Sequence, residues 1–464
     1  MNTTIAPFKK RVTLVLLSMS IFLSVLDLFI VNVAIPQIRE ALNANVADIQ
    51  FIIVYYVIGY GAFLITSGKV GLKYGHKRVF ILSIFSFGLF SFLCGIASTV
   101  EQLNLFRLLQ GMSGAFMVPQ GVTLLATVFT EEQERRRAYA IYGAIAGIAS
   151  VLGQVLGGFL PDLAYDFGAW RLIFLINVPL AFLVGLLSCF LLVEVERKKT
   201  IQIQPLSQLT LIALLVLFLY SLVRGVDAGW TTFLLLGFVF SVLGILMFFY
   251  FQFKKYKQNK SVLIDFKPFK NSAFKVTLLA LVFYSFVQDS YFFIYANHFQ
   301  LQLHYTATET GLLFAFQGIG YVLASLLSFK FLAQYQERFM LLGLLLMVVG
   351  LITHYLLLRT EQLTFYQVSL LLFEYGVGCG IILPSMFTYA LSTLPTAYTS
   401  AGSSLYLTVQ QLSIALGVSL VGQTYFSSTN GFLYATILML ILLILTGSVF
   451  LLSYQRRLTA FMQN

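Results

Sequence analysis

The chain has 464 residues, of which 59% are hydrophobic and 10% are charged. Soluble globular proteins carry about 25% charged residues, so this composition excludes a water-soluble enzyme, a disordered protein and a nucleic-acid-binding protein. The net charge of +11 does not change this conclusion, because nucleic-acid binding needs a solvated basic surface.

Apolar runs of membrane-spanning length recur along the whole chain. They are too long and too evenly apolar for barrel strands, and only helices or closed barrels satisfy their backbone polar groups in lipid. The first run lacks a small-residue cleavage site, so we interpret it as a span and not as a signal peptide. We predict an all-α polytopic membrane protein with fourteen transmembrane helices, at 12–36, 49–70, 79–98, 102–127, 138–161, 172–193, 207–224, 231–252, 273–301, 308–330, 338–358, 364–393, 400–425 and 431–453.

Lys and Arg residues are divided unevenly between the loops on the two sides of these spans. With the N-terminus inside, 24 of the 29 lie in cytoplasmic segments and Arg107 lies within a span. The positive-inside rule then places both termini in the cytoplasm. The remaining four, in the outer loops, are Arg39, Arg171, Arg224 and Arg359.

A short internal repeat relates the two ends of the chain. Residues 57–78 match residues 318–339, and the match continues from a span into the loop that follows it. It predicts two parallel six-helix halves, an architecture in which a transporter's site lies at the midplane between the halves. The predicted organisation is an N-terminal half at 1–200, two inserted helices at 201–255, a basic cytoplasmic linker at 256–272 and a C-terminal half at 273–464.

Of the 18 acidic residues, three lie deep within predicted spans, Asp27, Asp289 and Glu374, and Arg107 is the matching base. A rise of 1.5 Å per residue puts the three carboxyl groups about 13–17 Å from the span ends, in one layer near the membrane centre. A charge there costs at least about 2.5–3.5 kcal/mol, so such a carboxyl group takes up a proton readily. These acids carry protons or bind a cationic group of a substrate; alternatively, Asp27 and Arg107 form an ion pair that only joins two spans.

Five motifs follow one another along the first half of the chain. They are LDLFIVNVAIP (Leu26–Pro36), GKVGLKYGHKR (Gly68–Arg78), RLLQGMSGA (Arg107–Ala115), GQVLGG (Gly153–Gly158) and WRLIFLINVP (Trp170–Pro179). In this order and at these spacings they resemble the signature motifs of the fourteen-span drug:proton antiporters of the major facilitator superfamily. The resemblance covers essentially the whole chain.

The resemblance implies the major facilitator fold and a proton-coupled antiporter that exports small organic compounds, amphipathic or cationic, by alternating access. Together with the buried charges it assigns proton coupling to Asp27, Asp289, Glu374 and Arg107. It implies a multidrug efflux protein of the bacterial inner membrane, with no enzymatic activity and no cofactor, driven by the proton gradient. The expected partners are a small-molecule substrate and membrane lipid, without nucleic acid, and the expected state is a monomer.

Two positions depart from the family pattern. Leu72 stands where the loop motif usually has Asp, and Gln154 stands where the span-5 motif usually has Pro. Proline removes a backbone donor and bends a helix, whereas glutamine does neither. Gating and substrate class are the properties that these changes affect.

Amides and aromatic rings within the spans are candidates for the wall of a substrate cavity. Aromatic walls with a few polar anchors suit a flat or amphipathic ligand, and a cation can also use the ring faces; for each single residue the alternative is ordinary helix packing. The candidates are Gln110, Gln154, Gln288 and Gln410, with Tyr284, Tyr291, Phe292 and Tyr375.

Glycines and loop cations are the candidates for gating, because small residues allow helices to approach and slide past one another. They are Gly68, Gly75, Lys77, Arg78, Gly153, Gly157 and Gly158.

Several functional classes find little support. The chain has no P-loop motif, so ATP is not expected to drive transport. The three cysteines show no paired spacing, and the four histidines lie at loops or span ends, so neither a disulfide framework nor a metal site is expected. One alternative is a dedicated metabolite or siderophore transporter of the same fold, exporter or importer. The remote alternative is a membrane enzyme or nontransporting sensor, for which the chain offers no catalytic constellation.

Overall fold

The computed structural model describes residues 7–163, 168–194, 202–227, 229–358, 363–395 and 398–462. Within its helices, the side chains of residues 7, 136, 328–337, 400 and 453–462 are not described. The predicted loop cations Arg197, Lys198, Lys199 and Arg359 therefore lie outside the described residues, and so does the side chain of Lys330 in the repeat.

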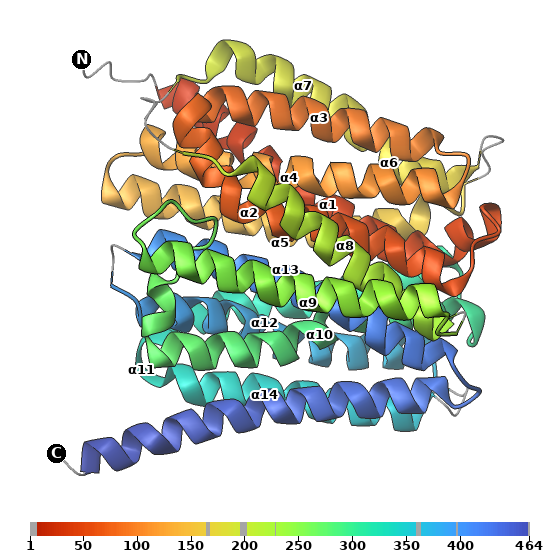
Figure 1. Cartoon of the computed structure of the whole chain (residues 1–464). Helices are drawn as coiled ribbons and strands as arrows, with labels where there is room; N and C mark the ends of the chain where they lie inside the picture. The colour runs from red at the N-terminus through yellow and green to blue at the C-terminus, as the bar shows by residue number, and fades with distance from the viewer. Residues whose placement is uncertain are drawn as a thin grey trace. The chain divides into compact units, whose positions relative to one another are not determined.

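All regular structure in the described residues is helical (Figure 1). Two short 3₁₀ segments, η1 (Ala169–Arg171) and η2 (Lys267–Lys270), accompany the α-helices. The α-helices are α1 (Pro7–Ala41), α2 (Val46–Tyr74), α3 (His76–Ile96), α4 (Val100–Val128), α5 (Glu132–Phe159), α6 (Leu172–Leu175), α7 (Asn177–Leu191), α8 (Pro205–Asp227), α9 (Thr232–Lys257), α10 (Ser272–Leu301), α11 (Ala307–Leu358), α12 (Phe365–Ser392), α13 (Thr399–Phe426) and α14 (Gly431–Met462).

Fourteen helical segments of the described chain are long and apolar enough to cross a membrane, which confirms the predicted number. Several helices continue beyond the predicted spans: α5 begins at Glu132 and α9 ends at Lys257. Glu, Arg and Lys are good helix formers, so a helix need not end where its apolar run ends.

Helices and spans do not correspond one to one. The segment Ala169–Leu191 combines η1, α6 and α7 into one span, whereas α11 carries two, Ala307–Leu327 and Arg338–Leu358. The sequence predicts a break between these two spans, but the backbone from 331 to 337 is helical. That stretch contains neither Gly nor Pro, so it has no local signal that ends a helix.

Polar caps fix the start of several spans. The Asn45 side chain accepts a hydrogen bond from the Asp48 N–H (2.9 Å), and the Asp48 carboxylate accepts one from the Asn45 N–H (3.1 Å), which forms a capping box for α2. Thr99 and Asn271 accept in a similar way at the starts of α4 and α10. These caps satisfy the free N–H groups of the first turn.

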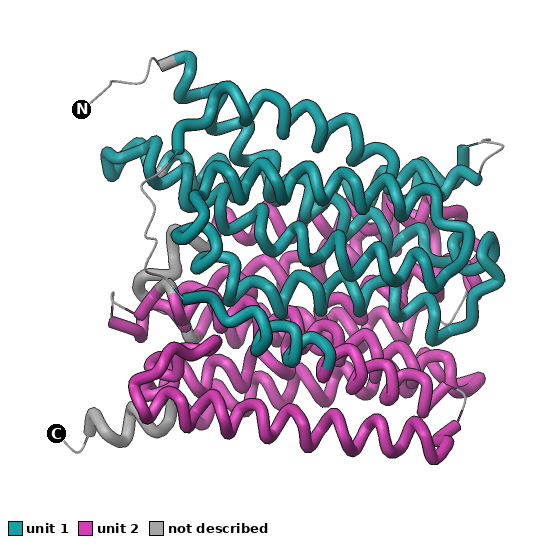
Figure 2. The backbone as a smooth tube through the Cα atoms, turned by 45° about the horizontal axis from the view of Figure 1, so that its top comes forward, with its two compact units in different colours: residues 1–213 teal, residues 214–464 magenta. Residues whose placement is uncertain are grey.

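The chain divides into two compact units, Met1–Ala213 and Leu214–Asn464, coloured teal and magenta in Figure 2. Unit 1 contains α1–α7 and the start of α8, and unit 2 contains the rest. The division falls inside α8, so the predicted insert at 201–255 and the linker at 256–272 stay predictions.

Within unit 1, α2 and α4 pack with their backbones in close contact. A Cβ atom at Gly59 would lie 2.2 Å from the Leu108 carbonyl oxygen, and one at Gly111 would lie 2.0 Å from the Tyr56 carbonyl oxygen. Only glycine permits this approach, because no side chain fits at either position.

Within unit 2, α11 and α12 repeat the same contact. A Cβ atom at Gly320 would lie 2.3 Å from the Phe373 carbonyl oxygen, and one at Gly376 would lie 2.0 Å from the Gln317 carbonyl oxygen. In both units each carbonyl belongs to the residue three positions before the facing glycine. This agreement supports the internal repeat, in which Gly320 matches Gly59.

Candidate functional site

Asp27 of α1 lies at the centre of a hydrogen-bonded ion pair within unit 1. Its side chain is fully buried, and Arg107 Nη1 of α4 donates to Oδ2 at 2.5 Å. Gln110 Nε2 of α4 and Asn177 Nδ2 of α7 donate to Oδ1 at 2.8 and 3.0 Å. Two neighbouring helices thus hold the carboxylate, and the structure contains the ion pair that the sequence left as one alternative.

Arg107 is fixed by several groups besides Asp27. Its Nε donates to the Ile52 carbonyl oxygen of α2 at 3.2 Å, and its Nη1 also donates to Gln110 Oε1 at 2.8 Å. The Tyr56 ring lies 4.1 Å from the guanidinium carbon, which adds a cation–π contact. Because Arg107 is only 1% exposed, these contacts take the place of water.

The sequence of α4 explains this position. Arg107 and Gln110 are three residues apart, so they lie on one face of the helix and both reach α1. Gly111 follows directly and brings the α4 backbone against α2, within reach of the Ile52 carbonyl. The result is a self-contained neutral pair, in which losing either partner leaves an uncompensated buried charge.

Asp289 of α10 is equally buried but has different surroundings. Neither of its carboxyl oxygens has a hydrogen-bond partner among the described residues. A carboxylate ion without donors is strongly disfavoured away from water. This environment therefore accommodates Asp289 as a protonated, neutral group.

The paired glycines show why the two units differ. Counted from Gly111 and Gly376, the place of Arg107 on α4 is taken by Leu372 on α12. Leu372 is fully buried and supplies no charge. Unit 2 therefore lacks, at this place, the cation that neutralises the acid in unit 1.

Glu374 of α12 lies beside a stack of tyrosine rings. It is partly buried, and its Oε1 has no hydrogen-bond partner among the described residues. The ring of Tyr375 stacks on Tyr291 of α10 with centroids 4.0 Å apart, and Tyr291 stacks in turn on Tyr295 at 4.2 Å. The hydroxyl groups of Tyr295 and Tyr375 also lack partners in the described structure. Unit 2 thus gathers buried polar groups whose hydrogen-bonding capacity is unused.

The other predicted cavity residues are packed among helices. Gln410 Nε2 of α13 donates to Gln288 Oε1 of α10 at 3.0 Å. Phe292 packs edge-on against Phe314 with centroids 5.2 Å apart. Gln154 and Tyr284 are each at most 1% exposed.

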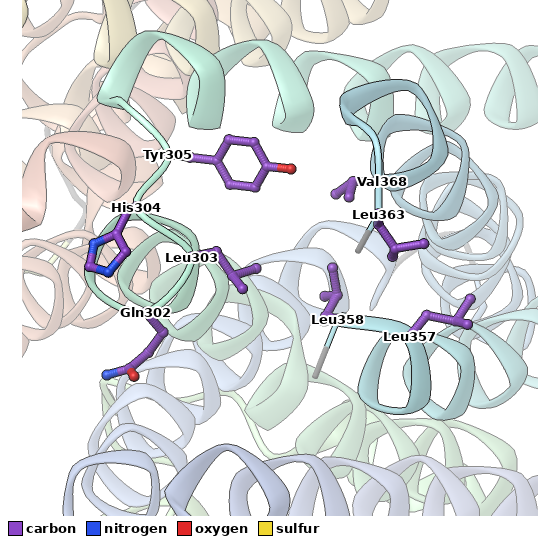
Figure 3. A pocket seen from close by; sticks show the side chains of 8 residues that line it. All are labelled: Gln302, Leu303, His304, Tyr305, Leu357, Leu358, Leu363 and Val368. Atoms are coloured by element: carbon purple, nitrogen blue, oxygen red, sulfur yellow. The ribbon is translucent and has the colours of Figure 1, made fainter. Parts of the chain in front are cut away.

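Two cavities occur elsewhere in unit 2. One of about 210 Å³ is lined by residues of α8 and α13. The other, of about 260 Å³, lies where α10 and α11 end and α12 begins (Figure 3). The second is lined by Gln302, Leu303, His304, Tyr305, Leu357, Leu358, Leu363 and Val368. Neither involves the predicted cavity residues, whose role stays a prediction.

The predicted gating loop between α2 and α3 is held by the end of α7. Gly75 has a φ of 101°, which favours glycine, and the Glu194 carboxylate lies against it. Glu194 Oε1 accepts from the Lys77 N–H at 3.2 Å, and Arg78 Nε lies 3.9 Å from Oε2. Lys77 Nζ donates to the Cys189 carbonyl oxygen at 2.8 Å. Glu194 thus gives this loop a carboxylate, although Leu72 replaces the acid of the motif itself.

The glycines of α5 position the segment of α1 that carries the buried acid. A Cβ atom at Gly153 would lie 2.8 Å from the Leu26 carbonyl oxygen, and one at Gly157 would lie 2.3 Å from the Ile30 carbonyl oxygen. The neighbouring Gly158 is also buried. By contrast, Gly68 is exposed and has open space around it.

The sequence missed a second buried network at the start of α3. His76 Nδ1 lies 2.6 Å from Gln120 Oε1, and Gln120 Nε2 donates to the Ser67 hydroxyl at 2.9 Å. Because the amide nitrogen donates, its oxygen accepts, so Nδ1 of His76 carries the proton. No motif in the sequence links these residues, and their close packing against Gly71, where a Cβ atom would lie 2.1 Å from Gln120 Oε1, is seen only in the structure. Asn177 was missed in the same way, although it lies in the WRLIFLINVP motif.

The sequence is similar to those of known proteins. The model of the family described as Major Facilitator Superfamily matches residues 17–274 and 277–460. The "Probable actinorhodin transporter" of Streptomyces coelicolor is 27% identical over 408 residues, covering 87% of this chain and 70% of the relative. The "Puromycin resistance protein pur8" of Streptomyces alboniger is 29% identical over 422 residues, covering 89% and 81%.

A solved structure shares the fold. It is a bacterial homologue of the human lysosomal transporter Spinster, in an inward-facing, unoccupied conformation. The TM-score is 0.70 at 15% sequence identity, with 97% of this chain and 98% of the other covered. The chain is thus a multi-pass membrane protein that belongs to the Major Facilitator Superfamily, in agreement with its resemblance to the fourteen-span drug:proton antiporters.

Proposed function

We propose that this protein is a proton-coupled antiporter that exports small organic compounds, amphipathic or cationic, by alternating access. It works as a monomer in the bacterial inner membrane, with both termini in the cytoplasm and the proton gradient as its energy source. Asp289 and Glu374 exchange protons, and Asp27 with Arg107 forms a second proton-linked pair. Gln110, Gln154, Gln288, Gln410 and the tyrosines of α10 and α12 are the candidates for contact with substrate.

One observation carries the proposal: Asp289 is fully buried and neither carboxyl oxygen has a partner in the described residues. Such a group is neutral while it is shielded, and it ionises when a conformational change brings water or a cation to it. Alternating access provides that change. The proton held in one state is then released in the other, where a cationic substrate can take its place.

Asp27 complements this role in a different way. Its carboxylate is neutralised by Arg107 at 2.5 Å, so it takes up a proton only when the ion pair opens. A conformational change that withdraws α4 from α1 would therefore couple protonation of Asp27 to movement within unit 1. The names of the relatives, which refer to antibiotic transport or resistance, support an exported organic compound.

The test is proton movement by purified protein in lipid vesicles, with ethidium as the organic cation and a pH-sensitive dye inside. Asp289→Asn replaces a group whose oxygens have no hydrogen bonds to lose, so the fold is expected to persist. We expect wild-type protein to move protons across the membrane in the direction opposite to ethidium. The variant is expected to move ethidium down its concentration gradient without moving protons.

The matched control is Ser290→Ala, a change at the next residue, whose hydroxyl donates only locally to the Phe286 carbonyl oxygen at 2.6 Å. It is expected to keep the proton signal. Proton release per ethidium that is the same in Asp289→Asn as in wild type would contradict the proposal.

A second candidate is a dedicated exporter of one natural product of the cell. It is favoured by the relative named as a probable actinorhodin transporter. The two candidates separate in a strain that lacks this protein. General sensitivity to unrelated organic cations supports multidrug export, whereas accumulation of a single cell-made compound supports the dedicated exporter.

A further inference from the structure

His354 of α11 is a buried histidine that the exchange at Asp289 does not use. Its side chain is 0% exposed, and Nδ1 lies 3.5 Å from the Tyr291 hydroxyl oxygen. Its ring centroid is 5.5 Å from that of Tyr295 and 5.8 Å from that of Tyr375. Nε2 has no hydrogen-bond partner within 3.5 Å among the described residues, although the imidazole also interacts with the backbone of Leu371 on α12. The only side-chain hydrogen bond of this buried imidazole among the described residues is thus the long one to Tyr291.

The position of Gly350 relates this histidine to Glu374. Gly350 precedes His354 by four residues on α11, so it lies about 6 Å deeper along the same helix face. A Cβ atom at Gly350 would lie 2.7 Å from Glu374 Oε2 and 3.2 Å from the Tyr375 ring. The carboxyl group of Glu374 is therefore about one helical turn below the imidazole.

The cavity of about 260 Å³ lies on the other side of His354. Leu358 lines it and follows His354 by four residues, one turn toward the end of α11. In Figure 3 the Tyr305 side chain points across the cavity toward Val368, which lies on the first turn of α12. His354 thus lies on α11 between the level of a surface cavity and the level of the partly buried Glu374.

The groups around His354 suit proton transfer. Tyr291, Tyr295 and Tyr375 stack at 4.0 and 4.2 Å and leave no gap between their rings for an organic molecule. Imidazole and phenol groups both donate and accept hydrogen bonds, so they can pass a proton on. In the described part of the chain, the titratable groups that face His354 are these tyrosines and, one turn deeper, Glu374.

We propose that His354, positioned by the Tyr291 hydroxyl, passes protons between the cavity at the Leu358 end of α11 and the carboxyl group of Glu374. In each transfer one ring nitrogen gains a proton and the other loses one, so the imidazole returns to its neutral form and Glu374 changes by one proton. This relay rests on the proposed function, because it delivers protons to Glu374, one of the acids assigned to proton coupling.

The test measures the proton on Glu374 directly and needs no transported substrate. Full-length protein in lipid vesicles is followed by infrared spectroscopy after a rapid pH change, through the carboxyl C=O band that disappears in Glu374→Gln. His354→Phe keeps a ring in place but cannot carry a proton. We expect it to slow the change of this band about tenfold or more, with the final amplitude and the melting temperature unchanged.

Two further variants identify the path. Tyr291→Phe removes the hydroxyl that positions the imidazole and is expected to slow the band as well. Combining it with His354→Phe is expected to add no further slowing, because both changes interrupt one path. The matched control is His298→Phe. His298 lies near the Leu301 end of α10, where its ring stacks on Phe432 with centroids 3.8 Å apart, and it has no hydroxyl partner among the described residues.

The outcomes separate the relay from the proposed function. The relay is overturned if the Glu374 band changes at the wild-type rate in His354→Phe. It is also overturned if His298→Phe slows the band and His354→Phe does not. Neither result affects the exchange proposed at Asp289. A missing Glu374-dependent band removes the proton role of Glu374 and the relay together. The ethidium experiment on Asp289→Asn tests the antiporter independently of these infrared results.

Discussion

Two buried aspartates of the same chain have different surroundings. Asp27 is held by Arg107, Gln110 and Asn177. Asp289 has no hydrogen-bond partner in the described residues. Under the proposed function, the two carboxyl groups are therefore expected to respond differently when a conformational change brings water to them.

The ion pair makes a prediction about stability. Arg107→Leu leaves Asp27 as an unpaired buried acid, so the free energy of unfolding is expected to fall by about 3–5 kcal/mol. The double change Asp27→Asn with Arg107→Gln removes both charges and is expected to recover most of this loss. Denaturant or thermal unfolding in detergent measures both. A double variant as unstable as Arg107→Leu would show that the charge is not the cause.

At the scale of helices, reciprocal glycines set the spacing that the site needs. Gly111 allows α4 to bring Arg107 to α1 and α2, and Gly376 allows α12 to bring Glu374 and Tyr375 to α11. Paired glycines therefore position an arginine in unit 1 and a glutamate and a tyrosine in unit 2.

A methyl group tests this spacing. Gly376→Ala places Cβ 2.0 Å from the Gln317 carbonyl oxygen, which the backbone can relieve only by moving apart, so a loss of about 1–3 kcal/mol is expected. Gly143→Ala is the matched control, because it lies in α5 with nothing within 4 Å of the new atom. Thermal unfolding is expected to leave the control unchanged or stabilised by about 1 kcal/mol, since Ala favours helix over Gly.

At the scale of the whole molecule, the basic residues predict the orientation in the membrane. The loop after α9 carries Lys260, and it follows a helix whose last turn holds Lys254, Lys255 and Lys257. The positive-inside rule places this loop in the cytoplasm and the loop after α10, with Gln302, outside.

Cysteine labelling checks this orientation. In a background with the exposed Cys189 replaced by Ser, a membrane-impermeant maleimide added to intact cells is expected to label Gln302→Cys. It is expected to reach Lys260→Cys only after the cells are opened, because the positive-inside rule assigns that loop to the inner face. The reverse pattern would invert the topology and place the cavity beside His354 on the cytoplasmic side.

Much of the fold followed from local pattern. Apolar runs predict spans well, because in lipid the helix is almost the only way to satisfy the backbone. The sequence is less informative where local signals are weak: the two predicted spans on either side of 331–337 are confirmed, but the residues between them are helical and not a loop, since they include no helix-ending residue.

Composition and sequence position predict the fourteen spans and put Asp27, Arg107, Asp289 and Glu374 inside them, because apolar runs of this length enter the membrane. The groups that these four residues contact are visible only in the folded chain. Asn177 reaches Asp27 from 150 positions away, and His354 meets Tyr291 across 63. Such partners depend on how helices pack side by side, and in this chain that packing depends on single glycines such as Gly111 and Gly376.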